Sequence, residues 1–269
     1  MGAVVKVERV TFAYAGQKPV LDNLTAIFPP GQISVILGRN GSGKTTLLKC
    51  LCGALRPQAG TITLAGEDIG IMGQRQIAQK VAIVRQDAQY VFPYTVLDIV
   101  MMGRTPHLNF FNIPYEQDVK IVRQNLAFVG MHTYEYKKAG ELSSGESQLV
   151  LLARALAQCT PILLLDEPNA HLDIYNEMRM LQLISQLVTQ QRLTVIAALH
   201  NPEIAYWFAD QIFMMEQGQL HCSGSPQEVM TDANLSRIYG TAIGTFRLSL
   251  NYMAMVPQEF LKDKSLLNR

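Results

Sequence analysis

The chain has 269 residues and a net charge of +1, which is enough length for one large α/β domain or two small ones. The near-neutral charge and the absence of any long Lys/Arg run disfavour nucleic acid or an anionic lipid surface as the main partner. Residues 1–10 show no basic segment followed by a long apolar one, and no apolar run approaches about 18 residues. We therefore expect neither export nor a membrane-spanning helix. The four cysteines show no metal-like C-x-x-C spacing, so we expect buried, reduced thiols.

The N-terminal part of the chain has the pattern of short strands. Apolar and polar residues alternate over 4–28, which predicts antiparallel strands with one exposed face. The continuous apolar run Ile33–Leu37 predicts a buried strand, and the leucines after residue 46 indicate an amphipathic helix. Thr61–Leu64 and Val81–Val84 predict two further short strands.

The middle of the chain changes to helical periodicity, from about residue 88 to residue 158. Thr95 and Asp98 have the spacing of a capping box at the start of a short helix. Tyr115–Val129 places its apolar residues three and four positions apart, as an amphipathic helix does. We interpret this region as a helical insertion.

Strand patterns return after the insertion. Pro161–Leu165 and Thr194–Leu199 are apolar throughout and enclose a helical segment, which is typical of a parallel sheet covered on both faces. The apolar stripe of that helix is predicted to contain Ile174, Met178, Leu181, Ile184 and Leu187. Residues 212–222 predict a hairpin, Ser225 begins a helix, and 241–269 predict one strand and a frayed tail.

The loop Gly38–Thr46, GRNGSGKTT, joins a predicted strand to a predicted helix. Its glycines permit backbone angles that a Cβ would forbid, so successive N–H groups can point at one anion near the positive end of the helix. Lys44 would then reach the β- and γ-phosphates of a nucleotide, and the Thr45 hydroxyl would bind Mg²⁺. A chance match to this pattern has odds of about one per cent in a chain of this length. The predicted nucleotide-binding residues of the loop are Gly38, Asn40, Gly41, Ser42, Gly43, Lys44, Thr45 and Thr46.

Polar residues follow the other apolar strands at their carboxyl ends, the edge of an open α/β sheet where ligands bind. We expect Asp166 to hold Mg²⁺ beside Thr45, because a hard cation prefers oxygen ligands. Glu167 is the candidate general base for an attacking water, Gln86 would orient that water or the metal, and His200 would bond the developing charge on the γ-phosphate. Taken singly, Asp-Glu-Pro also fits a helix start and His200 an ordinary strand-end histidine. The predicted catalytic set is Lys44, Gln86, Glu167 and His200, and the predicted metal set is Thr45, Gln86 and Asp166.

The stretch Glu141–Glu146, ELSSGE, can be interpreted in two ways. Ser143 and Glu146 have capping-box spacing at the head of an apolar helix, which explains both residues without any function. Capping does not explain Gly145. A glycine there leaves backbone N–H groups bare at the positive end of the helix, which favours anion binding.

Six ordered motifs together resemble those of ATP-binding cassette (ABC) transporter ATPase subunits, and the resemblance covers about residues 4–229. GRNGSGKTT matches the Walker A loop, Ile162–Pro168 the Walker B strand with its catalytic glutamate, and Leu142–Glu146 the signature usually written LSGGQ. The remaining matches are Gln86 to the Q-loop, Leu172-Asp173 to the D-loop and His200 to the switch histidine, with Tyr14 as the aromatic residue that stacks on adenine.

The resemblance implies that two copies of the chain enclose two ATP molecules, each signature facing the other copy's Walker A loop. Ser143, Gly145 and Glu146 would then lie at the nucleotide in trans, and Asp173 would contact the partner copy. The signature departs from the usual pattern at Ser144 and Glu146, and Asn201 follows the histidine where Asp is usual. We expect slower or more tightly regulated hydrolysis at most.

The resemblance also implies a transport role. Dimer closure on ATP would move a membrane permease bound to the helical insertion and the Q-loop, on the cytoplasmic face of the membrane. The segment 91–107, with 151–158 and 166–173, resembles the importers of metal chelates: iron-siderophore, haem, cobalamin and molybdate. A substrate-binding protein would then be an indirect partner. The aromatic and apolar residues of 91–107 also fit a subdomain core.

Two other classes of protein share a phosphate-binding loop. Soluble ABC ATPases that act on nucleic acid or ribosomes usually carry two cassettes or a long coiled coil, and sustained heptads are absent here. The function of a small-molecule kinase would not explain the ELSSGE stretch. We therefore expect an α/β P-loop NTPase fold with a RecA-like parallel core, an N-terminal antiparallel β subdomain and a helical insertion. In a single domain over 1–269, the core covers about 1–87 and 159–240, the helical subdomain 88–158 and the C-terminal strand and tail 241–269.

Overall fold

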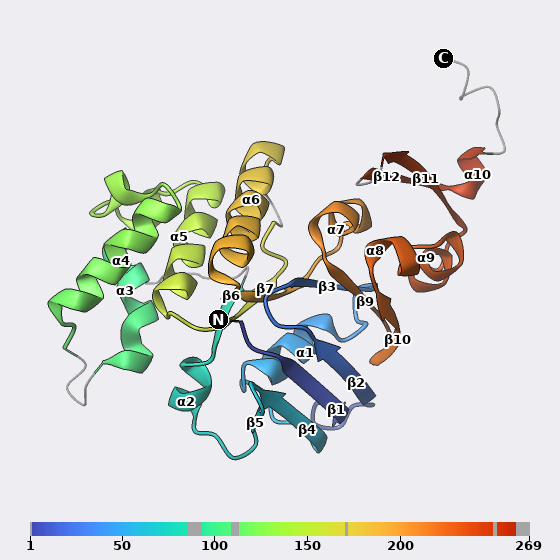
Figure 1. The fold of residues 1–269 in the computed structure, drawn as a ribbon, viewed down its shortest axis with the longest axis horizontal. Coiled ribbons are helices and arrows are strands. Elements are labelled where there is room, and N and C mark those ends of the chain that lie inside the picture. Colours follow the sequence, from blue (N-terminus) through green and yellow to red (C-terminus); the bar gives the residue numbers. More distant parts are fainter. Residues whose placement is uncertain (1, 86–92, 109–112, 170–171, 250–251, 262–269) are drawn as a thin grey trace.

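The computed structural model describes residues 2–85, 93–108, 113–169, 172–249 and 252–261, and Figure 1 shows their arrangement. The strands are β1 (Val5–Phe12), β2 (Leu21–Phe28), β3 (Ile33–Leu37), β4 (Ala59–Leu64), β5 (Glu67–Asp68), β6 (Val81–Arg85), β7 (Ile162–Asp166), β8 (Thr194–Ala198), β9 (Gln211–Glu216), β10 (Gln219–Gly224), β11 (Ile243–Ser249) and β12 (Tyr252–Pro257). The α-helices are α1 (Lys44–Leu51), α2 (Gln74–Ala78), α3 (Val96–Met101), α4 (Glu116–Phe128), α5 (Ser144–Ala157), α6 (Ile174–Gln191), α7 (Pro202–Phe208), α8 (Pro226–Val229), α9 (Asp232–Tyr239) and α10 (Gln258–Leu261). Short 3₁₀ turns are η1 (Met102–His107), η2 (His132–Tyr134) and η3 (Ala139–Glu141).

The central sheet has six strands in the order β10-β9-β3-β8-β7-β6. The strands from β9 to β6 pair in parallel, and β10 adds an antiparallel edge through the β9–β10 hairpin. Every residue of β3 and β8 is buried, as expected for strands covered on both faces. The parallel register brings the carboxyl ends of β3, β6, β7 and β8 to one edge, so the predicted strand-end arrangement is confirmed for the described strands.

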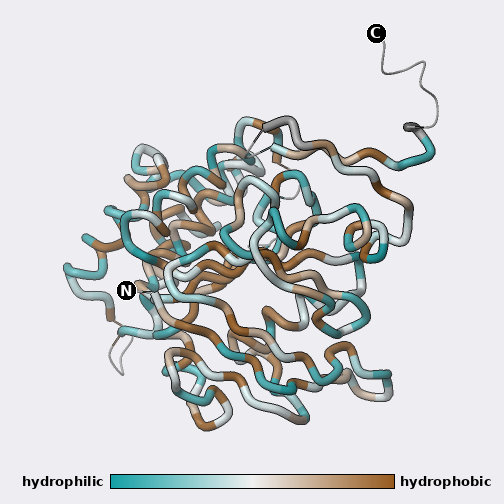
Figure 2. Tube along the Cα trace, turned by 45° about the vertical axis from the view of Figure 1, so that its right-hand side comes forward, coloured by the Kyte–Doolittle hydropathy of each residue, from teal (hydrophilic) through white to brown (hydrophobic). Residues whose placement is uncertain are grey.

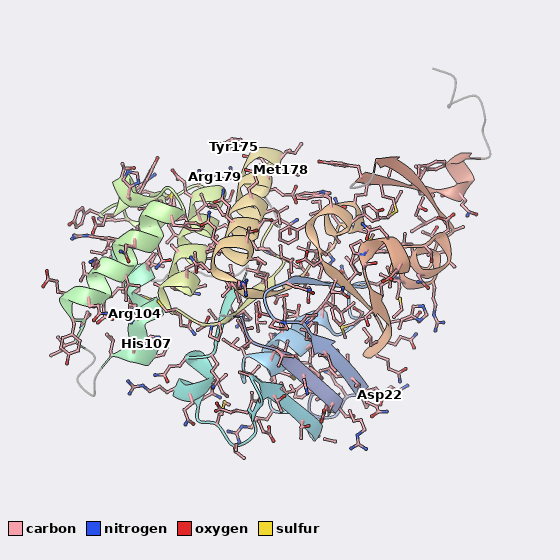
Figure 3. All side chains as sticks on the ribbon, viewed as in Figure 1. Asp22, Arg104, His107, Tyr175, Met178 and Arg179 are labelled. Carbon is pink, nitrogen blue, oxygen red and sulfur yellow. The ribbon has the colours of Figure 1, made fainter. Side chains whose placement is uncertain are left out.

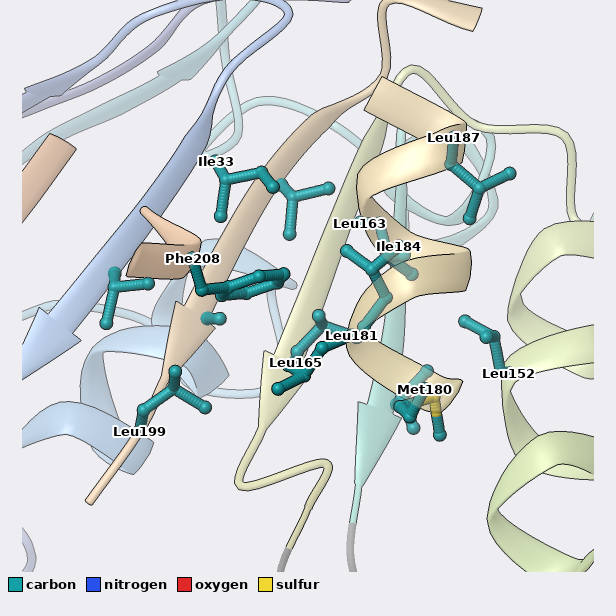
Figure 4. Packing of buried hydrophobic residues seen from close by; sticks show 14 of the residues in the cluster. Ile33, Leu152, Leu163, Leu165, Met180, Leu181, Ile184, Leu187, Leu199 and Phe208 are labelled. Carbon is teal, nitrogen blue, oxygen red and sulfur yellow. The ribbon is translucent and has the colours of Figure 1, made fainter. Parts of the chain in front are cut away.

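Alternate side chains of the central strands enter two different cores. Val35 and Leu37 face the cluster that contains the helical subdomain, α6 and α7. Ile36 faces the other cluster, together with α1 and the N-terminal strands. Figure 4 shows Leu181 and Ile184 of α6 packed over Leu163 and Leu165 of β7, and in Figure 2 the apolar residues concentrate in these interior segments.

The N-terminal strands form a separate antiparallel sheet in the order β2-β1-β4-β5, as the alternation over 4–28 predicts. It lies at the bottom of Figure 1, with α1 between it and the central sheet. The rings of Phe28 and Phe213, 4.5 Å apart between centroids, join the two sheets. Both sheets therefore share the core around α1, the helix that follows the glycine-rich loop.

The predicted helical insertion forms the group α3–α5 at the left of Figure 1. The Thr95 capping box is confirmed, because the Thr95 side chain accepts from the Asp98 N–H while Asp98 Oδ2 accepts from the Thr95 N–H. The predicted helix over Tyr115–Val129 is α4.

Two predictions of burial are wrong. Ile174, expected on the apolar stripe of α6, is 77% exposed, and the buried positions of this helix are Met180, Leu181, Ile184, Leu187 and Val188. The first turn of α6 lies at the top of Figure 3, where Tyr175 and Met178 are labelled, and burial along this helix begins only at Met180. Among the cysteines, all free, only Cys50 is buried and Cys159 is exposed.

The chain after residue 240 forms more structure than one strand. β11 and β12 pair as an antiparallel hairpin, with Ile243 opposite Pro257. The hairpin packs on α7, and the Met255 N–H donates to Glu203 Oε1 at 2.9 Å. This segment is therefore attached to the helix that directly follows His200.

Candidate active site

The glycine-rich loop connects β3 to α1 with a backbone that requires glycine at its end. Gly43 is the N-cap residue of α1 with φ 103°, a left-handed angle. A Cβ on Gly43 would lie 2.8 Å from the carbonyl oxygen of Val20, closer than van der Waals contact allows. The loop therefore lies too close to Val20, the residue before β2, to leave room for a side chain at position 43.

Lys44 lies within the curve of this loop. Its Nζ donates to the carbonyl oxygens of Gly38 at 2.7 Å and Arg39 at 3.2 Å, and the residue is only 5% exposed. Burial lowers the pKa of Lys44, while the carboxylates of Glu167 and Asp166 oppose that shift. The ammonium group is thus placed where the backbone N–H groups can bind phosphate.

Thr45 and Asp166 present two oxygen ligands from different elements. The Thr45 hydroxyl donates to Asp166 Oδ1 at 3.0 Å, joining the first turn of α1 to the end of β7. Burial raises the pKa of Asp166, as does the neighbouring Glu167 carboxylate, whereas the Thr45 hydrogen bond lowers it. A hydroxyl and a carboxylate at this spacing fit a hard divalent cation such as Mg²⁺.

Glu167 follows Asp166 with a left-handed backbone, φ 52°. Its N–H donates to the carbonyl oxygen of Ala198 at 3.1 Å, which fixes it against the end of β8. His200 Nε2 donates to Glu167 Oε1 at 2.5 Å. The fold thus brings the predicted base into direct contact with the predicted switch histidine, a contact that the sequence alone does not reveal.

Lys44, Thr45, Glu167 and His200 line one cavity of about 340 Å³, whereas Asp166 and Gly38 do not line it. Its lining residues are Val20, Asn40, Gly41, Ser42, Gly43, Lys44, Thr45, Thr46, Glu167 and His200. Tyr14 lies beside it, since its hydroxyl is 3.4 Å from Thr46 Oγ1. Gln86, predicted to orient water or metal, lies outside the described residues.

Val20 and Gly218 are neighbours of the loop that the sequence does not indicate. Val20 lines the cavity, and the Gly218 N–H donates to the carbonyl oxygen of Ser42 at 3.1 Å. Both come from turns that reach the loop only through long-range packing. Ser42 Oγ is buried and has no hydrogen-bond partner among the described residues, so it is available to a ligand of the loop.

The signature residues lie elsewhere. Ser143 is the N-cap residue of α5, and the predicted capping box with Glu146 is confirmed by bonds of 3.2 Å and 2.8 Å. The Ser143 N–H lowers the pKa of Glu146, and the Lys137 ammonium adds to the effect. The Glu146 carboxylate is therefore bound within its own helix start. Ser143, Gly145, Glu146 and Asp173 do not line the cavity around Lys44.

Gly145 has a packing reason to be glycine that the sequence does not reveal. A Cβ there would lie 2.6 Å from the Cγ of Asn176 in α6. The Asn176 amide donates to Asp173 Oδ2 at 3.0 Å, and its backbone N–H donates to Asp173 Oδ1 at 2.8 Å. One asparagine thus connects the signature to the predicted D-loop aspartate within a single chain.

A Gly145→Ala substitution should lower the free energy of unfolding by about 1–3 kcal/mol, because the new methyl group displaces Asn176. In an Asn176→Ala background, Gly145→Ala should lower the free energy of unfolding by much less than in wild type. Chemical denaturation of the two single variants and the double variant measures this difference as a double-mutant cycle. If the two losses simply add, the packing explanation is wrong. ATPase assays on the double variant then show whether the backbone at Gly145 is needed for catalysis as well.

A larger hollow of about 600 Å³ lies between α4, α5 and the end of α6, and its described lining residues carry no charged side chain. Among the described residues, no group of three His, Cys, Asp or Glu side chains is placed to hold a metal ion. None of the helices in the described part of the chain has both the length and the apolar character needed to cross a membrane. The cavity around Lys44 brings a lysine, a glutamate and a histidine together with the glycine-rich loop, so we take it as the candidate active site.

A parallel sheet whose first loop holds a buried lysine, with a carboxylate pair and a histidine at the neighbouring strand ends, defines a P-loop nucleotide-binding protein. The family model described as ABC transporter matches residues 21–170. The chain belongs to the ABC transporter family, as its ATP-binding domain.

Relatives and solved structures agree with this assignment. A cobalamin import ATP-binding protein of Halobacterium salinarum is 36% identical over 228 residues, covering 84% of this chain but 57% of that protein. The chain thus spans little more than half the length of this relative. A protein named for iron chelatin transport in Helicobacter pylori is 36% identical over 241 residues, covering 89% of this chain and 94% of that protein. An inward-facing structure described as a metal-chelate type ABC transporter superposes with a TM-score of 0.83 at 29% identity, covering 95% and 98% of the two chains. The predicted fold class is confirmed.

Proposed function

We propose that this chain is the ATP-hydrolysing subunit of an ABC importer for a metal chelate. The observation that carries the proposal is the convergence of Lys44, Glu167 and His200 on one cavity beside the Thr45–Asp166 pair. The relatives named for cobalamin and iron chelatin transport support the substrate class.

In hydrolysis, Lys44 and the loop N–H groups would hold the β- and γ-phosphates of ATP. Glu167 would take a proton from the attacking water as its oxygen bonds to the γ-phosphorus and the bond to the β-phosphate oxygen breaks. His200, already bonded to Glu167, would orient that carboxylate and stabilise the charge on the γ-phosphate. Mg²⁺, when bound, would offset phosphate charge, and Thr45 and Asp166 would hold it together with Gln86.

A second copy of the chain would complete the site. Ser143 and Gly145 head a 14-residue helix whose positive end suits a phosphate, yet they do not line the cavity of their own chain. The exposed start of α6, with Asp173 as its N-cap residue, would lie in the same interface. Closure on ATP would drive a membrane permease, with the chain at the cytoplasmic face. A substrate-binding protein would act through that permease. The sequence contains no long run of Lys and Arg that would favour a mechanical role on nucleic acid.

Purified protein should release phosphate from ATP only with Mg²⁺ present, and the rate per subunit should rise with subunit concentration at low concentrations because two copies form each site. Malachite-green phosphate assays across a dilution series measure both effects. A rate per subunit that is independent of concentration down to nanomolar levels would contradict a reversible two-copy site. Affinity purification from solubilised membranes should recover a polytopic permease, and recovery of ribosomes or nucleic acid instead would refute the transport role.

A further inference from the structure

The side chain of Gln58 pairs with the backbone of Ala13 as a neighbouring strand would. The Ala13 N–H donates to Gln58 Oε1 at 2.6 Å, and Gln58 Nε2 donates to the Ala13 carbonyl oxygen at 2.7 Å. The Gln58 backbone N–H also donates to the carbonyl oxygen of Thr11 at 2.9 Å. Three hydrogen bonds thus join the residue before β4 to the last residues of β1 and the residue after it.

The Gln58–Ala13 pairing lies directly before Tyr14 in the chain. β1 ends at Phe12, and the chain then enters a turn in which the Gln17 N–H donates to the Tyr14 carbonyl oxygen at 3.0 Å. Ladder pairing has ended at Ala13, so the Gln58 amide extends it by one residue. The backbone that carries Tyr14 is therefore fixed from the side of β4.

The Tyr14 ring has two further contacts. Phe12 meets it edge to face, with ring centroids 5.0 Å apart and planes at 89°. Its hydroxyl lies 3.4 Å from Thr46 Oγ1, at the start of α1. Tyr14 as a whole is 36% exposed, so it has free surface beside the cavity at the phosphate-binding loop.

We propose that Gln58 is a positioning residue for the base of the bound nucleotide. It holds Tyr14 so that the ring stacks on the base, whereas the central sheet holds the phosphates through a different segment of chain. The carboxamide of Gln58 donates to the Ala13 carbonyl from one atom and accepts from the Ala13 N–H at another, whereas an ionised carboxylate of the same size can only accept. The proposal rests on the proposed function, since it takes ATP as the ligand.

Gln58→Glu keeps the size of the side chain and removes the donor, so its carboxylate faces the Ala13 carbonyl oxygen. The dissociation constant for ATP should rise about tenfold, within the range of base–aromatic stacking. The dissociation constant for inorganic tripolyphosphate, which has no base, should stay within twofold of wild type. Isothermal titration calorimetry under conditions without hydrolysis measures the dissociation constants of both ligands. Gln190→Glu, at an exposed position of α6, is the matched control for the added charge.

The outcomes separate the possible roles. An equal rise in the dissociation constants for ATP and tripolyphosphate would show that Gln58 supports only the corner of the sheet, which would overturn the proposal. Unchanged ATP binding would overturn it as well. In a Tyr14→Ala background Gln58→Glu should have no further effect on ATP binding, because the ring it positions is absent. Should Gln58→Glu fail to fold, Gln58→Ala replaces it in the same cycle. Wild-type protein that binds tripolyphosphate but not ATP would refute the proposed function itself.

Discussion

Glu167→Gln should lower the rate of ATP hydrolysis by about 10²- to 10⁴-fold, the usual contribution of a positioned general base. The amide keeps the shape of the side chain and can still accept the hydrogen bond that His200 Nε2 now makes at 2.5 Å. It cannot take the proton of the attacking water. Single-turnover phosphate release at saturating ATP measures the chemical step directly.

Affinity for ATP should be retained in this variant, because Lys44 and the loop are unchanged. Removing the negative charge of Glu167 also removes its repulsion of the triphosphate. Glu116→Gln, an exposed position in the first turn of α4, is the matched control and should hydrolyse ATP at the wild-type rate. Hydrolysis by Glu167→Gln at the wild-type rate would show that another group is the base.

Arg104→Met should lower the free energy of unfolding by about 3–5 kcal/mol, because it leaves a buried carboxylate without its cation. Arg104 Nε donates to Asp118 Oδ1 at 2.8 Å, and the two side chains are only 8% and 9% exposed. Another guanidinium nitrogen donates to the carbonyl oxygen of Ala157 at 2.7 Å. Figure 3 shows Arg104 near His107, at the side of the helical subdomain. Urea denaturation followed by circular dichroism measures the loss.

Two further variants test the cause of that loss. Arg104→Met with Asp118→Leu should recover most of the stability, since apolar pairs often replace buried ion pairs at little cost. Arg123→Met removes the same cation from a more accessible pair, in which the side chains of Arg123 and Glu135 are 54% and 17% exposed, and should leave the unfolding free energy close to that of wild type. If Arg104→Met and Arg123→Met were equally mild, burial would not be the source of the effect.

The arrangement of the central sheet could be predicted from the sequence because its signal is strong and local. β3, β7 and β8 are almost continuously apolar, with one polar residue each (Ser34, Asp166 and Thr194), and a strand covered on both faces has this pattern wherever it occurs. The edge that carries Asp166 and His200 follows from parallel pairing. Ile174 shows the limit of this reasoning, since periodicity gives the face of a helix and not how far the helix extends beyond its sheet.

The finer contacts of the site depend on segments far apart in the chain. Gln58 meets Ala13 across 45 residues, and no local pattern distinguishes this glutamine from a surface one. The packing reason for glycine at position 145 depends on Asn176, 31 positions further along the chain, because only its position shows what a Cβ would contact. The β11–β12 hairpin was missed because its strands carry weak alternation, and in β12 only Met253 is fully buried. The assigned roles of the site residues stay predictions.

At Glu167, folding stability and the proposed catalytic role make opposite demands on one residue, because its backbone is left-handed. A non-glycine residue with this φ costs about 1–2 kcal/mol, and glycine there would remove that strain together with the carboxylate. Selection for thermal robustness alone would thus favour loss of the proposed base at this position. The protein retains an unfavourable conformation at the residue to which the proposed mechanism assigns the proton transfer, so stabilising it without loss of activity would have to begin elsewhere.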